Sequence, residues 1–458
     1  MLRLIRKSIQ AARGTEGNVL ARSVTVNLAG RVGYLLVGFV AAIVLARLLG
    51  PSGRGLLGLM ISFNSVALVV TTIGVPLAIV YFASLRDADQ GALLGNSLLQ
   101  AVVLTVVLVP LSMLFYDVLA DAFGEGHGGS TWILVAALVP VTFLDWTTHG
   151  QVQGMLLFGR FSAMLVLSRV AYAVAIALLV GALDLGVAGG VIATGVGSLA
   201  MIAGSLKPIL AKSRLRLDRP LMRDTLHYGW RVQLGSIFQL TNGRLDVLVM
   251  QFFRPLSQVG YYVVAQTIAE LVITLANAFQ SSVMPLITSY GGDERAEQTS
   301  IDSIRHHGIL AAVAVVANAV FGTLVILIGY GSEFRPAVGP MLILLPGIWF
   351  LGMGIVIQGD LSGRARPGLS SALAGMSAAI TIVLDFVLIP PLGMYGGAIA
   401  SVVAYTAFGI ASLVALGRVS GIPWHELAIP TRADFAGYWV VIRRASAVVR
   451  PRRSRTTS

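Results

Sequence analysis

Long apolar stretches alternate with short polar ones along almost the whole chain. Each apolar stretch has about 20 residues, the length at which an α-helix crosses the roughly 30 Å of hydrocarbon in a bilayer. The pattern therefore predicts an all-α polytopic membrane protein with about 12 transmembrane helices. The predicted spans are residues 24–45, 56–81, 93–115, 131–152, 161–180, 187–203, 230–252, 261–287, 309–328, 338–357, 368–389 and 398–416.

A basic polar segment divides these spans into two runs of six, which we predict to form two parallel six-helix bundles around a central cavity. Its basic side chains are Lys207, Lys212, Arg214, Arg216, Arg219 and Arg223. The predicted organisation is 1–23 (cytoplasmic N-terminal segment), 24–205 (N-terminal six-helix half), 206–229 (basic cytoplasmic connector), 230–416 (C-terminal six-helix half) and 417–458 (cytoplasmic basic tail). Within this tail, 432–449 has the amphipathic composition of an interfacial helix.

A short motif is repeated in the two runs. Residues 185–194 read LGVAGGVIAT and residues 392–401 read LGMYGGAIAS, and each motif opens the last span of its half. Because each half crosses the membrane an even number of times, the halves have the same orientation and a pseudo-twofold axis along the membrane normal. The alternative is chance similarity between apolar segments, which the matching position in each half disfavours.

Charged residues are distributed unevenly about the spans. Of the 33 Lys and Arg residues, four lie in predicted external loops and three within spans, and the others lie in segments predicted to be cytoplasmic. This asymmetry follows the positive-inside rule and places both termini in the cytoplasm. Abundant Arg, Ala, Val and Gly beside scarce Lys suggest a GC-rich bacterial genome, and hence the bacterial cell membrane.

Composition excludes several other classes. The chain is 56% hydrophobic and 12% charged, with a mean hydropathy of +0.82, outside the range of soluble proteins. A net charge of +12 would suit nucleic acid only on one face of a soluble fold. Here the basic residues lie between apolar spans, so topology and anionic lipid headgroups account for them, and we expect no nucleic-acid partner.

No motif for enzymatic or cofactor chemistry is present. The sequence lacks cysteine, the P-loop pattern G-x-x-x-x-G-K-[ST] and the zinc-binding pattern H-E-x-x-H. His306 and His307 are predicted to form a solvated pair in a cytoplasmic loop. We therefore expect no enzymatic activity, no metal and no cofactor. Energy must come from an ion gradient, the membrane potential, a substrate gradient or a partner.

Charged residues inside the spans are the main functional candidates, because each is costly in hydrocarbon unless it faces a cavity or a partner. At ~1.5 Å per residue, Asp145 and Arg169 lie at similar depths in adjacent spans, and so do Arg244 and Glu270. Each pair is either a structural ion pair or part of a site. Arg31 lacks such a neighbour, so it either binds an anionic group such as phosphate in a water-filled cavity or extends to the headgroups.

Two further acids and several amides complete the candidate set. Asp385, near the external end of its span, either binds a coupling cation or caps its helix. The candidates for ion coupling or ion pairing are Asp145, Asp246, Glu270 and Asp385. The candidate substrate-binding residues of the cavity are Arg31, Asn27, Arg244, Arg169, Gln239 and Asn242. The amides cluster on corresponding spans, which favours a shared cavity over simple interhelical hydrogen bonds.

Three stretches carry a family resemblance: 46–60 (ARLLGPSGRGLLGLM), 244–272 (RLDVLVMQFFRPLSQVGYYVVAQTIAELV) and 384–405 (LDFVLIPPLGMYGGAIASVVAY). They resemble the polysaccharide, or oligosaccharide-lipid, flippases of the multidrug/oligosaccharidyl-lipid/polysaccharide exporter superfamily. The resemblance implies two six-helix bundles around a central cavity. It also implies alternating access that moves a polyprenyl-(pyro)phosphate-linked oligosaccharide from the cytoplasmic to the external leaflet, for cell-surface polysaccharide synthesis.

Individual positions both follow and depart from this family pattern. The matching residues are Gly50, Pro51, Gly55, Asp246, Gly260 and Tyr261. Arg54 stands where an aromatic residue is common, and Arg254 where a small residue is more common, so the substrate stays open. The partners implied are a lipid-linked glycan substrate and membrane lipids, with a polysaccharide polymerase and glycosyltransferases as further candidates.

Two other functions stay open at this point. A cation-coupled drug or metabolite exporter of the same superfamily would have a cavity with a net negative charge. A non-transporting membrane scaffold for a glycan-synthesis complex would have all of its intramembrane charges paired.

Overall fold

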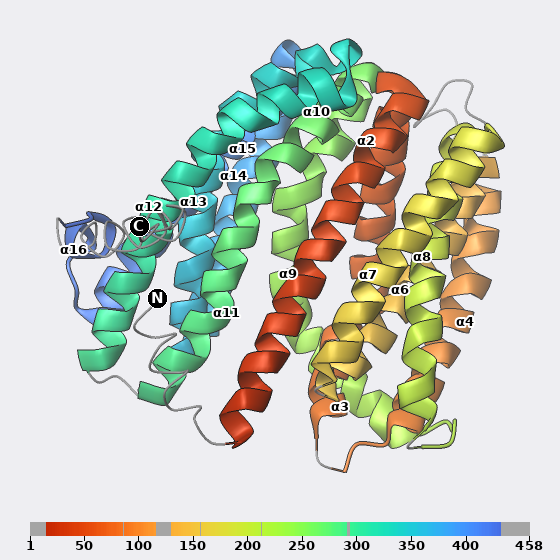
Figure 1. The fold of residues 1–458 in the computed structure, drawn as a ribbon, viewed down its shortest axis with the longest axis horizontal. Coiled ribbons are helices and arrows are strands. Elements are labelled where there is room, and N and C mark those ends of the chain that lie inside the picture. The colour runs from red at the N-terminus through yellow and green to blue at the C-terminus, as the bar shows by residue number, and fades with distance from the viewer. Residues whose placement is uncertain are drawn as a thin grey trace, which may run out of the picture. The chain divides into compact units, whose positions relative to one another are not determined.

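The computed structural model describes residues 15–85, 87–115, 130–155, 157–211, 213–290 and 294–431. Over these ranges every regular element is a helix (Figure 1), which confirms the predicted all-α membrane class. Ten of the described segments are long and apolar enough to cross a membrane. The finer prediction of about 12 spans in two bundles around a cavity stays a prediction. The predicted interfacial helix at 432–449 lies outside the described residues.

Helix α2 (Thr15–Thr72) contains the first two predicted spans, 24–45 and most of 56–81. The two legs meet at Gly50, whose φ of 64° and ψ of 180° are not helical. A residue with a Cβ rarely adopts this conformation, and the following Pro51 has no N–H to donate to the preceding turn. The local sequence therefore accounts for the sharp bend that separates the two legs.

The second leg also ends earlier than predicted, at a break before α3 (Val75–Ser84). Ile73 and Gly74 have φ angles of 50° and 70°. A Cβ on Gly74 would lie 2.2 Å from the carbonyl oxygen of Gly229 in α9 (Arg219–Phe253). Only a glycine allows this approach, so the second predicted span is two helices whose junction packs against α9.

The other helices of the predicted N-terminal half are α4 (Gln90–Leu114), α6 (Ser130–Gly154), α7 (Phe158–Ala175), the π-helix η1 (Ile176–Ala182) and α8 (Gly186–Leu210). After α9, the chain forms α10 (Leu256–Ala269), η2 (Glu270–Val272), α11 (Ile273–Tyr290), α12 (Glu294–Leu324), η3 (Val325–Tyr330), η4 (Ser332–Ala337), α13 (Val338–Gly363), α14 (Pro367–Leu392), α15 (Met394–Ser420) and α16 (Trp424–Ala428).

Packing divides the chain into two compact units. The first comprises Met1–Ala265, Leu324–Pro340 and Thr381–Gly397, and the second comprises Gln266–Thr323, Met341–Ile380 and Ala398–Ser458. The first unit thus contains the predicted N-terminal half together with pieces of helices from the C-terminal half. The predicted halves, 24–205 and 230–416, therefore stay a prediction that rests on the repeated motif in the sequence.

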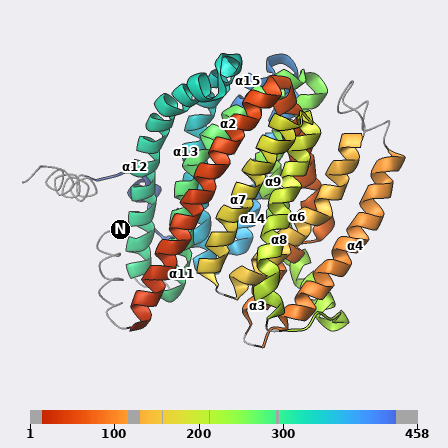
Figure 2. The same cartoon turned by 45° about the vertical axis from the view of Figure 1, so that its right-hand side comes forward.

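The first unit is a bundle in which α2 and α7, α7 and α8, α6 and α8, and α4 and α6 pack against one another (Figure 2). One apolar cluster of this bundle is formed by side chains of α2, α6, α7, η1 and α8, among them Leu45, Leu59, Trp132 and Ile176. Removing such side chains from solvent contributes about 25 cal/mol per Å² of apolar area. This core fixes the helices that carry the interior charges.

The repeated motif has the same backbone conformation in both copies. Gly186 and Gly393, which follow Leu in the two motifs, have φ angles of 54° and 58°. A Cβ on Gly189 would lie 3.1 Å from the carbonyl oxygen of Leu179, and one on Gly396 would lie 2.1 Å from that of Leu388. In both copies a glycine therefore lets the last helix pack against the end of the helix before it, which supports a structural repeat.

Within the predicted connector, 206–229, α8 extends to Leu210 and α9 begins at Arg219. The stretch between them lies against α4. A Cβ on Gly91 or Gly95 would lie 2.1 Å from the carbonyl oxygen of Arg214 or Arg216, respectively. Two glycines one helical turn apart thus provide a surface for the connector backbone.

Two side chains of the α4 region hold the connector in place. Asn96 donates to the carbonyl oxygen of Asp218 at 2.8 Å and accepts from its N–H at 3.0 Å. The Nε atom of Arg216 lies 2.7 Å from Oδ2 of Asp89. Partial burial favours a higher pKa for Asp89, but the Ala92 N–H and the charge of Arg216 together lower the pKa below its ordinary value. The connector is therefore docked, and is not a loose tether.

The second unit is tied together by interior polar contacts. Trp349 of α13 donates to the carbonyl oxygen of Gly308 in α12 at 2.9 Å. The prediction that His307 is solvated in a loop is wrong: it lies within α12 and is 1% exposed. The apolar pattern after this residue is that of a span, and the helix starts earlier because Glu294 and Glu297 in its first turn suit a helix N-terminus.

Candidate functional site

The structure does not describe the side chains of four predicted substrate-binding residues. Asn27 and Arg31 belong to α2, and Gln239 and Asn242 belong to α9, but these side chains lie outside the described part of the structure. Their roles stay predictions.

Two predicted acids, Asp246 of α9 and Asp385 of α14, lie close together in the first unit. Both side chains are fully buried, and the helices that carry them are joined where Arg254, at the end of α9, donates to the carbonyl oxygens of Ile389 and Pro390 in α14. Oδ2 of Asp246 accepts a hydrogen bond of 2.5 Å from the hydroxyl of Tyr262 in α10. Neither carboxylate oxygen of Asp385 makes a hydrogen bond within the described residues. The cluster therefore combines one hydrogen-bonded carboxylate with one that lacks a donor.

The second copy of the repeated motif packs beside this acidic cluster. Gly397 of α15 lies next to Tyr262, and a Cβ at this position would be 3.5 Å from the Tyr262 ring and 3.2 Å from Cε of Met250. The first of these distances is an ordinary van der Waals contact, so α15 packs directly against the tyrosine that bonds to Asp246. Sequence reasoning missed Tyr262, although its partner Asp246 and the neighbouring Tyr261 were both identified as family positions.

Arg169 of α7 is held by two tyrosines of the first unit. It donates a hydrogen bond to the hydroxyl of Tyr34, and its Cζ atom lies 4.2 Å from the Tyr34 ring centroid and 5.6 Å from that of Tyr172. Gly38 lies next to it, and a Cβ there would make an ordinary van der Waals contact, 3.7 Å from Cδ of Arg169. Its Nε atom is buried and makes no hydrogen bond to any described residue. Cation–π contacts thus position a guanidinium that keeps unused donors.

The predicted ion pair between Asp145 and Arg169 is not formed. Oδ1 of Asp145 lies 3.2 Å from Nδ1 of His149, one turn further along α6, while Arg169 bonds to Tyr34. Similar depth on adjacent helices did not ensure contact, because each side chain found a nearer partner. The i,i+4 spacing of Asp145 and His149 was the available signal.

The other predicted pair, Arg244 and Glu270, belongs to different units. Arg244 lies in the first unit and Glu270 in the second, so their pairing stays a prediction. Arg244 is half-buried and makes no hydrogen bond or ion pair to a described residue. It therefore remains a candidate for binding an anion.

Two arginines within the stretches that carry the family resemblance bond to backbone carbonyl groups at the ends of helices. Arg47 donates to the carbonyl oxygens of Gly329 and Ile328, both at 2.5 Å, at the end of η3. Arg254 donates to those of Pro390 and, at 3.5 Å, Ile389, at the end of α14. Both guanidinium groups donate to carbonyl oxygens in the last turn of a helix, where basic side chains commonly bond.

A second buried polar cluster, missed by sequence reasoning, lies in the second unit. Asp360 of α13 is 1% exposed and accepts from Nε of Arg364 at 2.7 Å and from the Ser300 hydroxyl of α12. Arg364 also donates to Ser300 at 3.0 Å. The i,i+4 spacing of Asp360 and Arg364 was a usable signal. All three side chains are mutually satisfied, so this cluster joins α12 to α13 and has no free capacity for a ligand.

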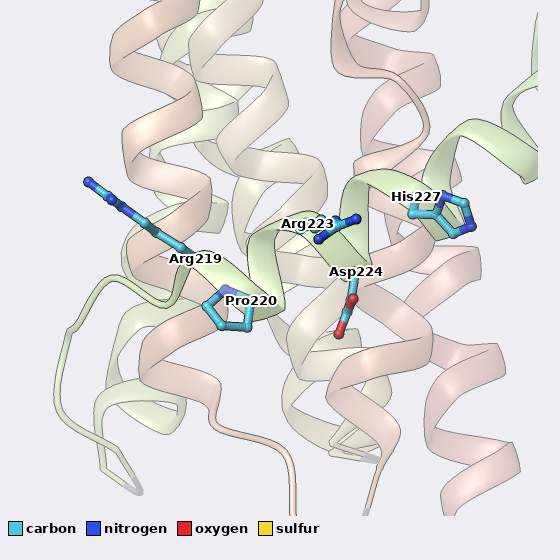
Figure 3. Close-up of a pocket in the computed structure, with 5 residues that line it drawn as sticks. All are labelled: Arg219, Pro220, Arg223, Asp224 and His227. Carbon is cyan, nitrogen blue, oxygen red and sulfur yellow. The ribbon is translucent and has the colours of Figure 1, made fainter.

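A pocket of about 510 Å³ lies at the start of α9 (Figure 3). Its lining residues are Arg219, Pro220, Arg223, Asp224 and His227. The side chains do not converge, since Arg219 and His227 point to opposite sides and Asp224 points away from both (Figure 3). Among the described residues no group of three or more His, Cys, Asp or Glu side chains could hold a metal ion. The interior charges of the first unit are therefore the better candidates for function.

Two solved structures share this fold. An inward-facing multidrug resistance MATE family transporter of the MOP superfamily matches with a TM-score of 0.70 at 17% identity, over 85% of this chain and 95% of that chain. The lipid II flippase MurJ in an inward closed conformation matches with a TM-score of 0.69 at 14% identity, over 92% and 93%. The chain therefore shares the fold of these two membrane transport proteins.

Sequence comparison gives the family. A probable low-salt glycan biosynthesis flippase, Agl15 of Haloferax volcanii, is 23% identical over 372 residues, covering 79% of this chain and 75% of that protein. An uncharacterized membrane protein, MJ1068 of Methanocaldococcus jannaschii, is 24% identical over 212 residues, and the match spans only 41% of its length. The family model described as polysaccharide biosynthesis protein matches residues 44–339. The chain belongs to this family.

Proposed function

We propose that this protein is a flippase that moves a polyprenyl-(pyro)phosphate-linked oligosaccharide from the cytoplasmic to the external leaflet by alternating access. Membership of the polysaccharide biosynthesis family supports this function, as does the likeness to a probable glycan biosynthesis flippase. The fold, shared with both a drug transporter and a lipid flippase, is compatible with it. The glycan would serve the synthesis of a cell-surface polysaccharide.

The observation that carries the proposal is the environment of the Arg169 side chain. Its guanidinium lies inside the first unit, is positioned by Tyr34, and has a buried Nε atom without a hydrogen bond to any described residue. No described acid forms an ion pair with it. A positioned guanidinium inside the membrane without a counterion matches the phosphate group of a lipid-linked glycan, whose several acceptor oxygens suit the planar fork of guanidinium donors.

We assign the energy coupling to Asp246 and Asp385. Asp385 is buried without a hydrogen-bond donor among the described residues, so binding of a proton or a monovalent cation would compensate its charge. Uptake and release of that charge change the packing of α9 against α14, because the two helices carry the two acids. Such a switch would let an ion gradient bias the equilibrium between inward-open and outward-open states.

The proposed orientation places both termini and the connector in the cytoplasm. The basic side chains between residues 207 and 223 support it, because the positive-inside rule favours them on that side. We further propose a bacterial plasma membrane as the location. A polysaccharide polymerase and glycosyltransferases are the partners that would consume and supply the lipid-linked substrate.

Reconstitution tests the function directly. Purified protein in liposomes should move a fluorescent polyprenyl-diphosphate sugar from one leaflet to the other, measured as the fraction accessible to a membrane-impermeant quencher. Arg169→Gln should lower the initial rate at least about tenfold, which is the cost of losing a charge-assisted hydrogen bond. Protein that left this lipid in place but extruded a cationic dye would contradict the proposal.

The second candidate, a cation-coupled drug or metabolite exporter, is favoured by the same two acids. If Asp246 and Asp385 bound a cationic substrate rather than a coupling ion, dye efflux should occur and should be lost in Asp385→Asn. The scaffold alternative requires that all intramembrane charges are paired. The unpaired Nε atom of Arg169 disfavours it.

A further inference from the structure

His307 of α12 is a buried imidazole that none of the sites described above uses. Its side chain is 1% exposed, and neither ring nitrogen makes a hydrogen bond to any described residue. A neutral imidazole has one donor and one acceptor nitrogen, so both polar groups have left water without a protein partner in exchange. Buried polar groups without partners are costly and uncommon, which makes this side chain a candidate for a role beyond packing.

Three helices of the second unit close around this imidazole. A Cβ on Gly352 of α13 would lie 2.9 Å from Cε1 and 3.0 Å from Nε2 of His307, so this edge of the ring packs directly on the α13 backbone. The same Cβ would lie 3.4 Å from Cβ of Ala276 in α11. The ring of Phe279, also in α11, meets the imidazole edge-on, with 5.6 Å between the ring centroids. His307 therefore lies where α11, α12 and α13 meet.

The two neighbouring helices offer no free acid that could balance a positive charge on this ring. α11 has no acidic or basic residue, and its single tyrosine is its last residue, Tyr290. The one charged residue of α13 is Asp360, eight residues beyond Gly352 and thus roughly 12 Å further along the helix. Its carboxylate is already bonded to Arg364 and Ser300.

On α12 itself, the nearest charged and titratable groups are bonded elsewhere. Arg305 donates to the carbonyl oxygen of Glu426 at 2.8 Å. His306 bonds through Nδ1 to the carbonyl oxygen of Asp302 at 2.7 Å, and the Asp302 carboxylate accepts from Gln298 at 2.8 Å. An imidazolium at position 307 would thus be a buried charge with no described acid bonded to it, which is strongly unfavourable. Protonation of this ring and close packing around it exclude each other.

We propose that His307 is a proton-binding site of the second unit, and that its protonation separates α12 from α11 and α13. The neutral ring suits the packed arrangement, whereas a ring that takes up a proton must reach water. The predicted span begins at residue 309, so His307 lies at the end of its apolar run, where water enters once the helices part. The inference goes beyond the proposed function, because it holds whichever lipid is moved. It adds a proton site to the unit that contains neither Asp246 nor Asp385.

An introduced thiol reports on this packing, because the chain contains no cysteine. Ala276→Cys places the thiol next to Gly352, at a position that is 0% exposed. Its labelling rate with a maleimide is measured on the full-length protein in detergent, and is divided by the rate in the same protein carrying His307→Phe at the same pH. This division cancels the pH dependence of the thiol itself. Because a solvated imidazole ionises near pH 6.5, we expect the ratio to be about tenfold higher at about pH 5.5 than at about pH 7.5.

His306→Gln is the matched control, because it removes a histidine of the same helix that already bonds to a backbone carbonyl group. Its labelling ratio should rise in acid as that of the wild type does. A ratio independent of pH in protein that retains His307 would overturn the proton site. A rise that is lost in His306→Gln would assign the proton to His306 and would likewise overturn the proposal.

Thermal unfolding gives a second measurement that needs no introduced thiol. Only the folded state keeps the ring neutral, so acidification from about pH 7.5 to 5.5 should lower the wild-type midpoint more than that of His307→Phe or His307→Gln. At the higher pH, His307→Phe should be at least as stable as the wild type, because no hydrogen bond is lost. His307→Gln replaces it if the larger ring prevents folding. Equal shifts of the midpoint in the wild type and the folded variants would overturn the site.

Transport in proteoliposomes separates this inference from the proposed function. Flipping of the polyprenyl-diphosphate sugar together with pH-independent labelling would overturn the proton site and leave the flippase function standing. Acid-dependent labelling that requires His307, without any flipping, would overturn the function but not the site. We expect the wild type to flip the lipid, at a rate that changes with pH by a larger factor than the rate of His307→Phe.

Discussion

The hydroxyl group of Tyr262 lies 2.5 Å from Oδ2 of Asp246, and both side chains are fully buried in the first unit. This contact joins α10 to α9 beside a second buried acid, Asp385. Tyr262→Phe removes the donor without changing the shape of the ring. We expect it to lower stability by about 1–3 kcal/mol, since a buried carboxylate loses a hydrogen bond. Thermal unfolding followed by tryptophan fluorescence measures the change, and an unaltered midpoint would contradict the expectation.

Asp385→Asn should uncouple transport from the ion gradient while the protein remains folded. The carboxylate is fully buried and has no hydrogen bond within the described residues, so its neutralisation removes a desolvation cost rather than a contact. The unfolding midpoint should stay constant or rise. In proteoliposomes, stimulation of flipping by an imposed proton or sodium gradient should disappear. Asp302→Asn, near the start of α12, is the control, and a full gradient response in Asp385→Asn would exclude this residue from coupling.

Gly55→Ala and Gly260→Ala should each destabilise the first unit. A Cβ on Gly55 would lie 1.9 Å from the carbonyl oxygen of Leu256, and one on Gly260 would lie 1.9 Å from that of Pro51. Backbone atoms cannot move aside as a side chain can, so we expect a loss of at least about 1–3 kcal/mol for each substitution. Gly368→Ala, where a Cβ meets no atom within 4 Å, should be neutral or slightly stabilising. Expression level and unfolding midpoint report the difference.

Arg364→Ala should destabilise the second unit. Asp360 is 1% exposed and would lose the guanidinium that lies 2.7 Å from its Oδ1 atom. An uncompensated buried carboxylate costs about 3–5 kcal/mol. The double variant Asp360→Asn/Arg364→Ala should regain part of the lost stability, because it also removes the buried charge. If the double variant were less stable than Arg364→Ala, the loss would have to come from packing instead.

Docking of the connector should depend on pH through Asp89. The pKa of this carboxyl is lowered from 3.8 in the folded protein, so its stabilising effect is complete above pH 3.8 and is lost as the pH falls through the lowered value. At pH 7, a protease should therefore cleave the 211–218 stretch faster in Asp89→Asn than in the wild type. The difference should vanish under acid conditions. Cleavage rates measured by mass spectrometry test this, and a difference that persisted at low pH would point to another cause.

The candidate functional residues fall into two groups. Some could be identified from the composition of the spans, and others only from their contacts in the structure. Asp246, Asp385 and Arg169 could be identified because a charge in an apolar span is costly whatever its surroundings. Their partners could not be identified in this way. Asp145 pairs with His149 and Arg169 with Tyr34, since many residues on neighbouring helices share a depth and only the rotation of each helix decides which of them meet.

Sequence alone determined that this is an all-α membrane protein with a repeated motif and a basic connector, and that it resembles polysaccharide flippases. Span length, charge asymmetry and local motifs are properties of the chain itself, so they can be read without coordinates. Tertiary structure decided that the connector is docked on α4, that His307 is buried, and that Tyr262 bonds to Asp246. These features arise from residues far apart in the chain. Their contacts depend on helix rotation and close packing, which periodicity in the sequence does not specify.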